Sequence, residues 1–155
     1  MSFDVPARLQ ERGWRLPTPP TPNGSYVPSV WSGRQLFVAG QTPMADGTLL
    51  FEGVVGVDLS LAQAQQAAEQ CALNALAIAA AATDGAFERL RVLKVTGFVR
   101  CLADFADTPR VLDGASEVLI HALGDRGRHV RAAVGVSALP RRAPVEVEIL
   151  FEVDQ

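Results

Sequence analysis

An arginine and two glutamates near the C-terminal end are the side chains of this 155-residue sequence best suited to acid–base or carboxylate chemistry. They lie in residues 129–153, HVRAAVGVSALPRRAPVEVEILFEV, which alternate like two strands joined by a tight Leu-Pro-Arg-Arg connection. Arg131 has the planar fork that binds a carboxylate at two points. Glu146 and Glu148 follow each other at strand spacing, and a partly buried carboxylate can act as a general base.

Strand alternation predicts which face of a sheet these side chains occupy. We expect the valines of 130–136 to meet the helices, with the apolar row of 145–153 aligned beside them. Arg131 and the small residue Ala133 would then share the opposite face with Glu146. Two interpretations remain open, because such a face can be solvated, with weak cross-strand ion pairs, or can form a pocket floor or an oligomer surface.

The helices that must position these residues are marked by their ends. Residues 3–12 suit a short amphipathic helix, and the proline-rich residues 16–24 suit an extended connector. The Ser-Leu-Ala-Gln segment at 60–63 is a capping box, and a long stripe of small residues follows it. A second helix should begin near Thr108, which precedes a proline, and end at Gly124.

Alternating or apolar segments between these helices predict the strands. The expected strands are 25–31 and 34–40, which form a hairpin around Ser32-Gly33, a short one within 48–57, 91–102, and the two of 129–153. The order ββ(β)αβαββ predicts one α+β domain, with a mixed sheet and both helices on one face. Crossovers between strands require some parallel pairs.

Composition favours a globular protein that does not bind nucleic acid. The chain is 48% apolar and 20% charged, with a net charge of −3. Cys71 and Cys101 lack CxxC spacing, so we expect small hydrophobes in a reduced compartment. His121 and His129 have no HxxxH or HxH relation, so no metal is expected. By parity, His129 could border the site of Arg131.

Two apolar features decide the expected location. The N-terminal residues lack the continuous apolar stretch of a signal peptide. The alanine-rich run 75–82 is too short to cross a bilayer. We therefore expect a cytoplasmic protein that does not enter a membrane.

Four segments in order resemble the YjgF-like family, also called the Rid or reactive intermediate deaminase family. They are GSYVPSV (24–30), LFVAGQTP (36–43), VLKVTGFVRCLADF (92–105) and RAAVGVSALPRRAPVEVE (131–148). The resemblance implies a chorismate-mutase-like fold assembled as a homotrimer, with a central barrel and ligand clefts between subunits. It further implies hydrolysis of reactive enamines and imines to a 2-oxo acid and ammonia, without metal or organic cofactor.

The family pattern also implies roles for individual residues of this sequence. Arg131 matches the arginine that clamps the substrate carboxylate, and Glu146 matches the glutamate that orients or activates water. Tyr26 matches the tyrosine of the cleft, and Gly40 and Gln41 match the Gly-Gln turn that lines it. The partner implied is a small carboxylated metabolite.

Several positions depart from the family pattern. Ala39 replaces a serine, and Ala133, a further candidate substrate-binding residue, replaces a cysteine or serine. Asp113 stands where the family has an asparagine. Residues 1–23 form an N-terminal extension, a short helix and proline-rich connector, before a YjgF-like domain at 24–155.

Three hypotheses for function follow. The first is a trimeric, cofactor-free enamine or imine deaminase, favoured by Glu146. The second is a non-catalytic binding or regulatory trimer, favoured by the alanines at 39 and 133. The third is RNA cleavage, because five arginines cluster in sequence and could attract phosphate; they are Arg126, Arg128, Arg131, Arg141 and Arg142. The net negative charge and the lack of a His–His or His–Lys pair argue against the third.

Overall fold

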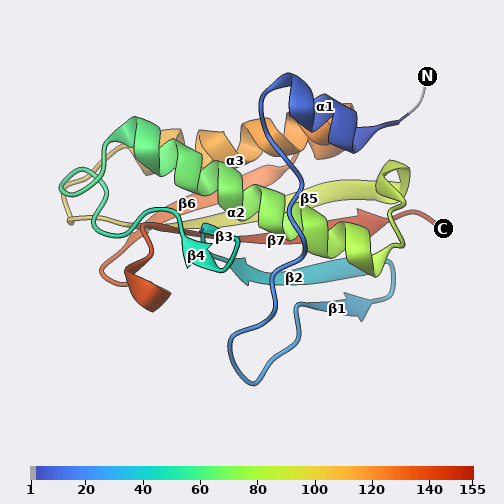
Figure 1. Cartoon of the computed structure of the whole chain (residues 1–155), viewed down its shortest axis with the longest axis horizontal. Helices are drawn as coiled ribbons and strands as arrows, with labels where there is room; N and C mark the ends of the chain where they lie inside the picture. The colour runs from blue at the N-terminus through green and yellow to red at the C-terminus, as the bar shows by residue number, and fades with distance from the viewer. Residues whose placement is uncertain (1–2) are drawn as a thin grey trace.

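A five-stranded mixed sheet organises the computed structural model, which describes residues 3–155 (Figure 1). The first two residues of the expected N-terminal extension lie outside the described residues. The spatial order of the strands is β1-β2-β7-β5-β6, with β5 and β6 parallel and the other neighbours antiparallel. The strands are β1 Ser29–Ser32, β2 Gln35–Gln41, β5 Leu90–Arg100, β6 Val130–Val136 and β7 Val145–Val153.

Two long helices, α2 Leu61–Ala82 and α3 Thr108–Leu123, cover one face of this sheet (Figure 1). The capping box that starts α2 is confirmed: the Gln63 backbone N–H donates to Ser60 Oγ at 3.1 Å, and the Ser60 N–H donates to Gln63 Oε1 at 2.9 Å. Gly124 ends α3 with a positive φ of 63°. The prediction of an α+β domain with a mixed sheet and both helices on one face is therefore confirmed.

Glycines allow α3 to approach its neighbours closely. A Cβ built on Gly114 of α3 would overlap the carbonyl oxygen of Gln65 in α2. A Cβ on Gly97 of β5 would overlap the side chain of Leu112 in α3. The small residues at these two positions thus bring α3 into direct contact with both α2 and β5.

Short elements complete the chain. The expected third short strand is β4, Thr48–Leu49, which pairs with β3, Met44–Ala45, outside the main sheet. The expected N-terminal helix is α1, Val5–Glu11, and it packs on α3 with Val5 and Leu9 fully buried. Three single turns of 3₁₀ helix are η1 Phe87–Arg89, η2 Gly124–Gly127 and η3 Pro140–Arg142.

The predicted pairing of the last two strands is wrong. β6 and β7 are not neighbours, because β5 lies between them and pairs with both. The connection through η3 therefore carries the chain over β5 rather than making a hairpin. Parallel pairing of β5 with β6 leaves β6 at the sheet edge, and the antiparallel strand β7 takes the central place.

The predicted facing of β6 is also wrong. Val95 of β5 faces the helices, and it pairs with both Arg131 and Ile149, so all three lie on the helix-covered face. Val130 is 68% exposed and Val134 is 43% exposed, on the face that α2 and α3 leave open. The register with β5 decides this orientation, because the burial of β5 outweighs the apolar character of the edge strand.

Within residues 3–155, no helix combines the length and apolar character needed to span a bilayer.

Candidate functional site

A pocket of about 890 Å³ opens between the proline-rich segment 17–23 and the end of β2. Four of the predicted site residues line it together: Tyr26, Gly40, Gln41 and Glu146. Arg131 and Ala133 do not line it. The pocket is large enough for a small metabolite, and its walls combine carboxylate, amide, phenol and guanidinium groups.

Glu146 of β7 lies directly against the backbone of Gly40. A Cβ on Gly40 would lie only 2.7 Å from Glu146 Oε1 and 3.2 Å from its Cδ. The ladder between β2 and β7 is irregular here, since Val38 pairs with Ile149 while Gln41 pairs with Val147. This bulge places a side chain-free residue where the carboxylate needs space.

The environment of Glu146 raises the pKa of its carboxyl above the ordinary value of 4.5. Burial is the largest cause, because it disfavours the charged form, and the negative charge of Glu148 adds to it. A carboxylate with a raised pKa is a stronger base, so this shift suits proton transfer to and from a bound water.

Asn74 is a pocket residue that sequence reasoning missed. It is fully buried in α2, and its Nδ2 donates to the carbonyl oxygens of Thr42 at 3.1 Å and Met44 at 2.9 Å. It thereby fixes the segment that follows the Gly40–Gln41 turn. The signal was a single amide inside a helical run that is otherwise almost entirely apolar.

Tyr26 and Gln41 both line the same pocket. Tyr26 is half exposed, and its hydroxyl accepts a bond from the backbone N–H of Asn23 at 3.4 Å. Gln41 Nε2 donates to the Ala39 carbonyl at 2.9 Å, which holds the turn closed. Both residues lie where a ligand in the pocket would meet them.

Arg131 is anchored to α3 on the helix-covered side of the sheet. Its Nη1 donates to Asp113 Oδ1 at 2.9 Å and to Ser116 Oγ at 3.0 Å, and its Nη2 donates to the Pro109 carbonyl at 3.1 Å. A guanidinium has five N–H donors, so Nε–H and one N–H of Nη2 are left for another acceptor. The anchors thus fix the group while leaving donors for a carboxylate.

Arg131 and Glu146 lie on opposite faces of one sheet, which corrects the prediction that they share a face. Glu146 pairs with Phe98, whose side chain is on the open face of β5. Arg131 pairs with Val95, whose side chain is on the helix-covered face. A single chain therefore does not bring the two groups together. Ala133 is also on the helix side, where Thr108 Oγ1 donates to its carbonyl at 3.1 Å.

His129 lies on the same side of the sheet as Arg131, because Ser116 contacts both side chains, but it does not line the Glu146 pocket. Its Nε2 lies 2.9 Å from Ser116 Oγ, and its Nδ1 lies 2.6 Å from the Gly127 carbonyl. Burial lowers the pKa of His129 below 6.5, and the positive charge of Arg131 acts in the same direction. The hydrogen bond to the Gly127 carbonyl acts in the opposite direction, but the net lowering of the pKa favours the neutral imidazole.

Four of the five arginines that cluster in sequence have a carboxylate partner. Arg126 pairs with Asp154, Arg128 with Asp125, Arg131 with Asp113 and Arg142 with Glu52. Among residues 3–155, Arg141 is the member of this group that has no carboxylate partner within 4.0 Å. Phosphate attraction by the cluster is thus largely offset by neighbouring acids.

The candidate metal ligands and the two cysteines are spread through the described part of the chain. Residues 3–155 contain no group of three or more His, Cys, Asp or Glu side chains arranged to hold a metal ion. Both cysteines are unpaired, and burial raises the pKa of the Cys71 thiol well above 9.0. Cys71 thus serves as a small core residue, as predicted.

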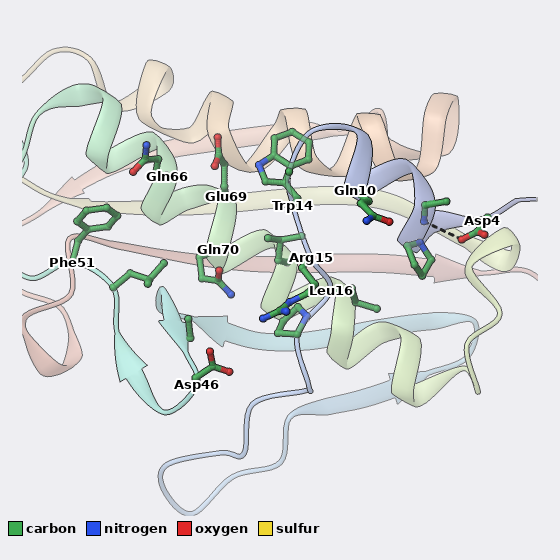
Figure 2. A pocket seen from close by; sticks show the side chains of 17 residues that line it. Asp4, Gln10, Trp14, Arg15, Leu16, Asp46, Phe51, Gln66, Glu69 and Gln70 are labelled. Atoms are coloured by element: carbon green, nitrogen blue, oxygen red, sulfur yellow. Dashed lines mark hydrogen bonds between the residues drawn. The ribbon is translucent and has the colours of Figure 1, made fainter.

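A second pocket of about 1200 Å³ lies on the outer side of α2, beneath the segment that follows α1 (Figure 2). Trp14, Arg15, Phe51 and Glu69 are among its lining residues. Burial raises the pKa of Glu69. None of the predicted site residues lines this pocket.

Comparison with known proteins identifies the family. The sequence profile of the family described as "YjgF/chorismate_mutase-like, putative endoribonuclease" matches residues 6–152. The chain therefore belongs to the YjgF/chorismate-mutase-like family.

Relatives match over nearly the full chain. Protein TCP17 of Trypanosoma cruzi is 38% identical over 97% of this chain and 94% of its own length. The RutC family protein y4sK of Sinorhizobium fredii is 35% identical, over 84% and 88% of the two chains. The crystal structure of protein Atu1372 from Agrobacterium tumefaciens, of unknown function, has 42% identity and a TM-score of 0.92, covering 97% of this chain and 92% of that one.

Proposed function

We propose that this protein hydrolyses small enamine or imine carboxylates to a 2-oxo acid and ammonia. The observation that carries the proposal is the position of Glu146, which has a raised pKa and lies against Gly40 in a pocket bordered by Tyr26 and Gln41. Membership of the YjgF family supports a small-molecule deaminase or a related function.

The reaction needs few protein groups. An enamine first takes up a proton on carbon and becomes the imine. Water then adds to the imine carbon while Glu146 accepts a proton from that water and passes it to the substrate nitrogen, which gives the carbinolamine. The carbinolamine hydroxyl next loses its proton through Glu146 to the leaving nitrogen, the C–N bond breaks, and ammonia departs from the 2-oxo acid, with Glu146 again a carboxylate. The substrate carbon is already electrophilic, so most of the advantage comes from holding the substrate and one water in line. A carboxylate is sufficient for this proton transfer.

A second copy of the chain is required to complete such a site, because Arg131 and Glu146 of one chain lie on opposite faces. The open face carries a row that crosses all five strands, and most of its members are apolar. The row consists of Val30, Phe37, Leu150, Lys94 and Val130. Val30, Phe37 and Val130 are each about half exposed or more. We propose that this face is buried in a homotrimer, which brings Arg131 of one copy to the Glu146 pocket of another.

A non-catalytic binding protein is the alternative. The alanines at positions 39 and 133 provide no hydroxyl or thiol to assist the chemistry, and Ala133 packs on the core instead. An arginine clamp without turnover would still bind a 2-oxo acid. RNA cleavage has less support, because most of the clustered arginines are paired with carboxylates. We expect purified protein to leave single-stranded RNA intact, even at low salt where phosphate binding is strongest.

Ammonia release from freshly generated 2-aminoacrylate tests the proposal. The wild-type protein should release ammonia faster than buffer does, and Glu146→Gln should slow this release by about 100-fold while 2-oxobutyrate still binds. Arg131→Ala should instead weaken 2-oxobutyrate binding by roughly thirty-fold or more, and Arg131→Lys should restore little. Binding of 2-oxobutyrate without any ammonia release would establish the non-catalytic alternative.

A further inference from the structure

Arg141 is a charged pocket residue to which the proposed reaction gives no role. It lines the pocket that also contains Asp46 and Glu146. The carboxylates of these two residues repel a negatively charged ligand. Arg141 has no carboxylate partner within 4.0 Å among residues 3–155, unlike Arg142 beside it, which pairs with Glu52 at 3.5 Å. A cation without a counter-charge, in a pocket for carboxylated molecules, is available to a ligand.

The backbone holds Arg141 in an unusual conformation. Its φ is 56° and its ψ is 22°, in the left-handed region that residues other than glycine rarely adopt. Arg142 follows with a φ of 63°. Such a conformation persists only where the surroundings enforce it. In this turn, η3, the Arg142 N–H donates to the Leu139 carbonyl at 3.2 Å and the Ala143 N–H donates to Pro140 at 3.0 Å.

Asn23, in the proline-rich segment before β1, positions the Arg141 side chain. With the Asn23 carboxamide turned so that both groups are satisfied, its oxygen accepts from Arg141 Nε at 3.2 Å and from Nη2 at 2.5 Å. Arg141 Nη1 has only the weak acceptor Met44 Sδ, at 3.9 Å. Asn23 therefore occupies one side of the guanidinium with a neutral oxygen, and donors on Nη1 and Nη2 remain for an anion.

We infer that Arg141 binds a second acidic group of the substrate, so that the preferred substrates are enamines or imines of dicarboxylates. This inference rests on the proposed function, because it assigns a role to another residue that lines the same pocket. The carboxylate next to the reacting carbon binds Arg131 of a second copy, the carbon lies beside Glu146, and the distal carboxylate binds Arg141. The segment 17–23 thereby contributes to specificity, through Asn23 and the proline-rich wall at 17–22.

A matched pair of product analogues tests the assignment by calorimetry on the intact wild-type protein. In 2-oxopentanoate and 2-oxoglutarate the carbon chain has the same length, and only the distal methyl or carboxylate differs. Wild-type protein should bind 2-oxoglutarate at least about ten-fold more tightly, since a charge-assisted contact in a partly enclosed pocket has this effect. Arg141→Met should reduce the ratio of the two dissociation constants to about one.

Two further variants control the experiment. Arg142→Met removes the neighbouring positive charge outside the pocket and should keep the wild-type ratio. Asn23→Leu should lower the ratio about three-fold, because Arg141 keeps its charge but loses its positioning partner. A wild-type ratio near one, or an unchanged ratio in Arg141→Met, would overturn the inference. Failure of both compounds to bind the wild-type protein would instead overturn the proposed function, and the inference with it.

Discussion

The hydroxyl of Ser116 lies 2.9 Å from Nε2 of His129 and connects that imidazole to the guanidinium of Arg131. The Gly127 carbonyl, 2.6 Å from Nδ1, can only accept, so Nδ1 carries the proton and Nε2 of the neutral ring is an acceptor. Ser116 therefore donates to His129, and its lone pair accepts from Arg131. Every polar group in this series has a partner of the correct kind.

Replacing Ser116, which contacts both His129 and Arg131, should leave the Arg131 guanidinium less firmly positioned. Ser116→Ala leaves the bonds of Arg131 to Asp113 and Pro109, so the fold should persist, but one anchor of the guanidinium is lost. We expect the dissociation constant for 2-oxobutyrate to rise about three- to ten-fold, which corresponds to a single hydrogen bond. Calorimetry gives the value, and Ser137→Ala at an exposed position should leave it unchanged.

Acid should destabilise the protein through His129. Burial lowers the pKa of this residue in the folded chain below its ordinary value of 6.5, so the unfolded chain takes up its proton first as the pH falls. The free energy of unfolding contributed by this site is thus fully present above about pH 6.5 and declines below it. Thermal melts between pH 7.5 and 5 should show the difference in Tm between wild type and His129→Gln shrinking with acidity.

Glu146 acts in the opposite sense in those melts. Its raised pKa favours the folded state as it becomes protonated, so only the difference between the two proteins isolates His129. A difference in Tm that stays constant across this pH range would contradict the prediction.

Gly40→Ala should damage catalysis more than folding. The added Cβ would meet the Glu146 carboxylate, which is the mobile end of a side chain, so the carboxylate should move and the backbone stay. We expect ammonia release to slow by about ten-fold or more, because misplacement of a catalytic group is costly, with little change in Tm. The double variant with Glu146→Gln should be no slower than Glu146→Gln alone; additive losses would show that Gly40 acts elsewhere.

The open face of the sheet should be essential for assembly. Val134→Glu places a charge at a 43% exposed valine of β6, on the face that we propose is buried between copies. Light scattering should show a trimer for wild type and a smaller species for the variant, which should also lose ammonia release. Ile120→Glu, at a 37% exposed position on α3, is the control that should remain trimeric.

Most of the fold could be predicted because its signals are local. Ser60 and Gln63 mark the start of α2, Gly124 marks the end of α3, and the β1–β2 hairpin follows from Ser32 and Gly33. Strand order could not be obtained in this way, because the insertion of β5 between β6 and β7 depends on which buried faces match across the sheet. The error over the face of Arg131 followed from that missing neighbour.

The candidate site was predicted only in part, because sequence motifs reveal individual residues but not contacts between distant segments. Motif matching found Gly40, Gln41, Tyr26 and Glu146, which the fold does bring to one pocket. It did not reveal Asn74, a buried amide without a motif, or the contact between Asn23 and Arg141. That contact joins residues more than a hundred positions apart through a turn with left-handed backbone, so no local pattern encodes it.

Gly114 relates the packing of the two long helices to the position of Arg131. It lies between Asp113 and Ser116, the two α3 side chains that hold Arg131, at the point where α3 rests against the Gln65 carbonyl of α2. The contact allows no extra atom, so a larger side chain at this position would push α3 away from α2. We therefore expect the affinity for a carboxylate bound by Arg131 to change with substitutions in the tightly packed interior, at positions that no ligand touches.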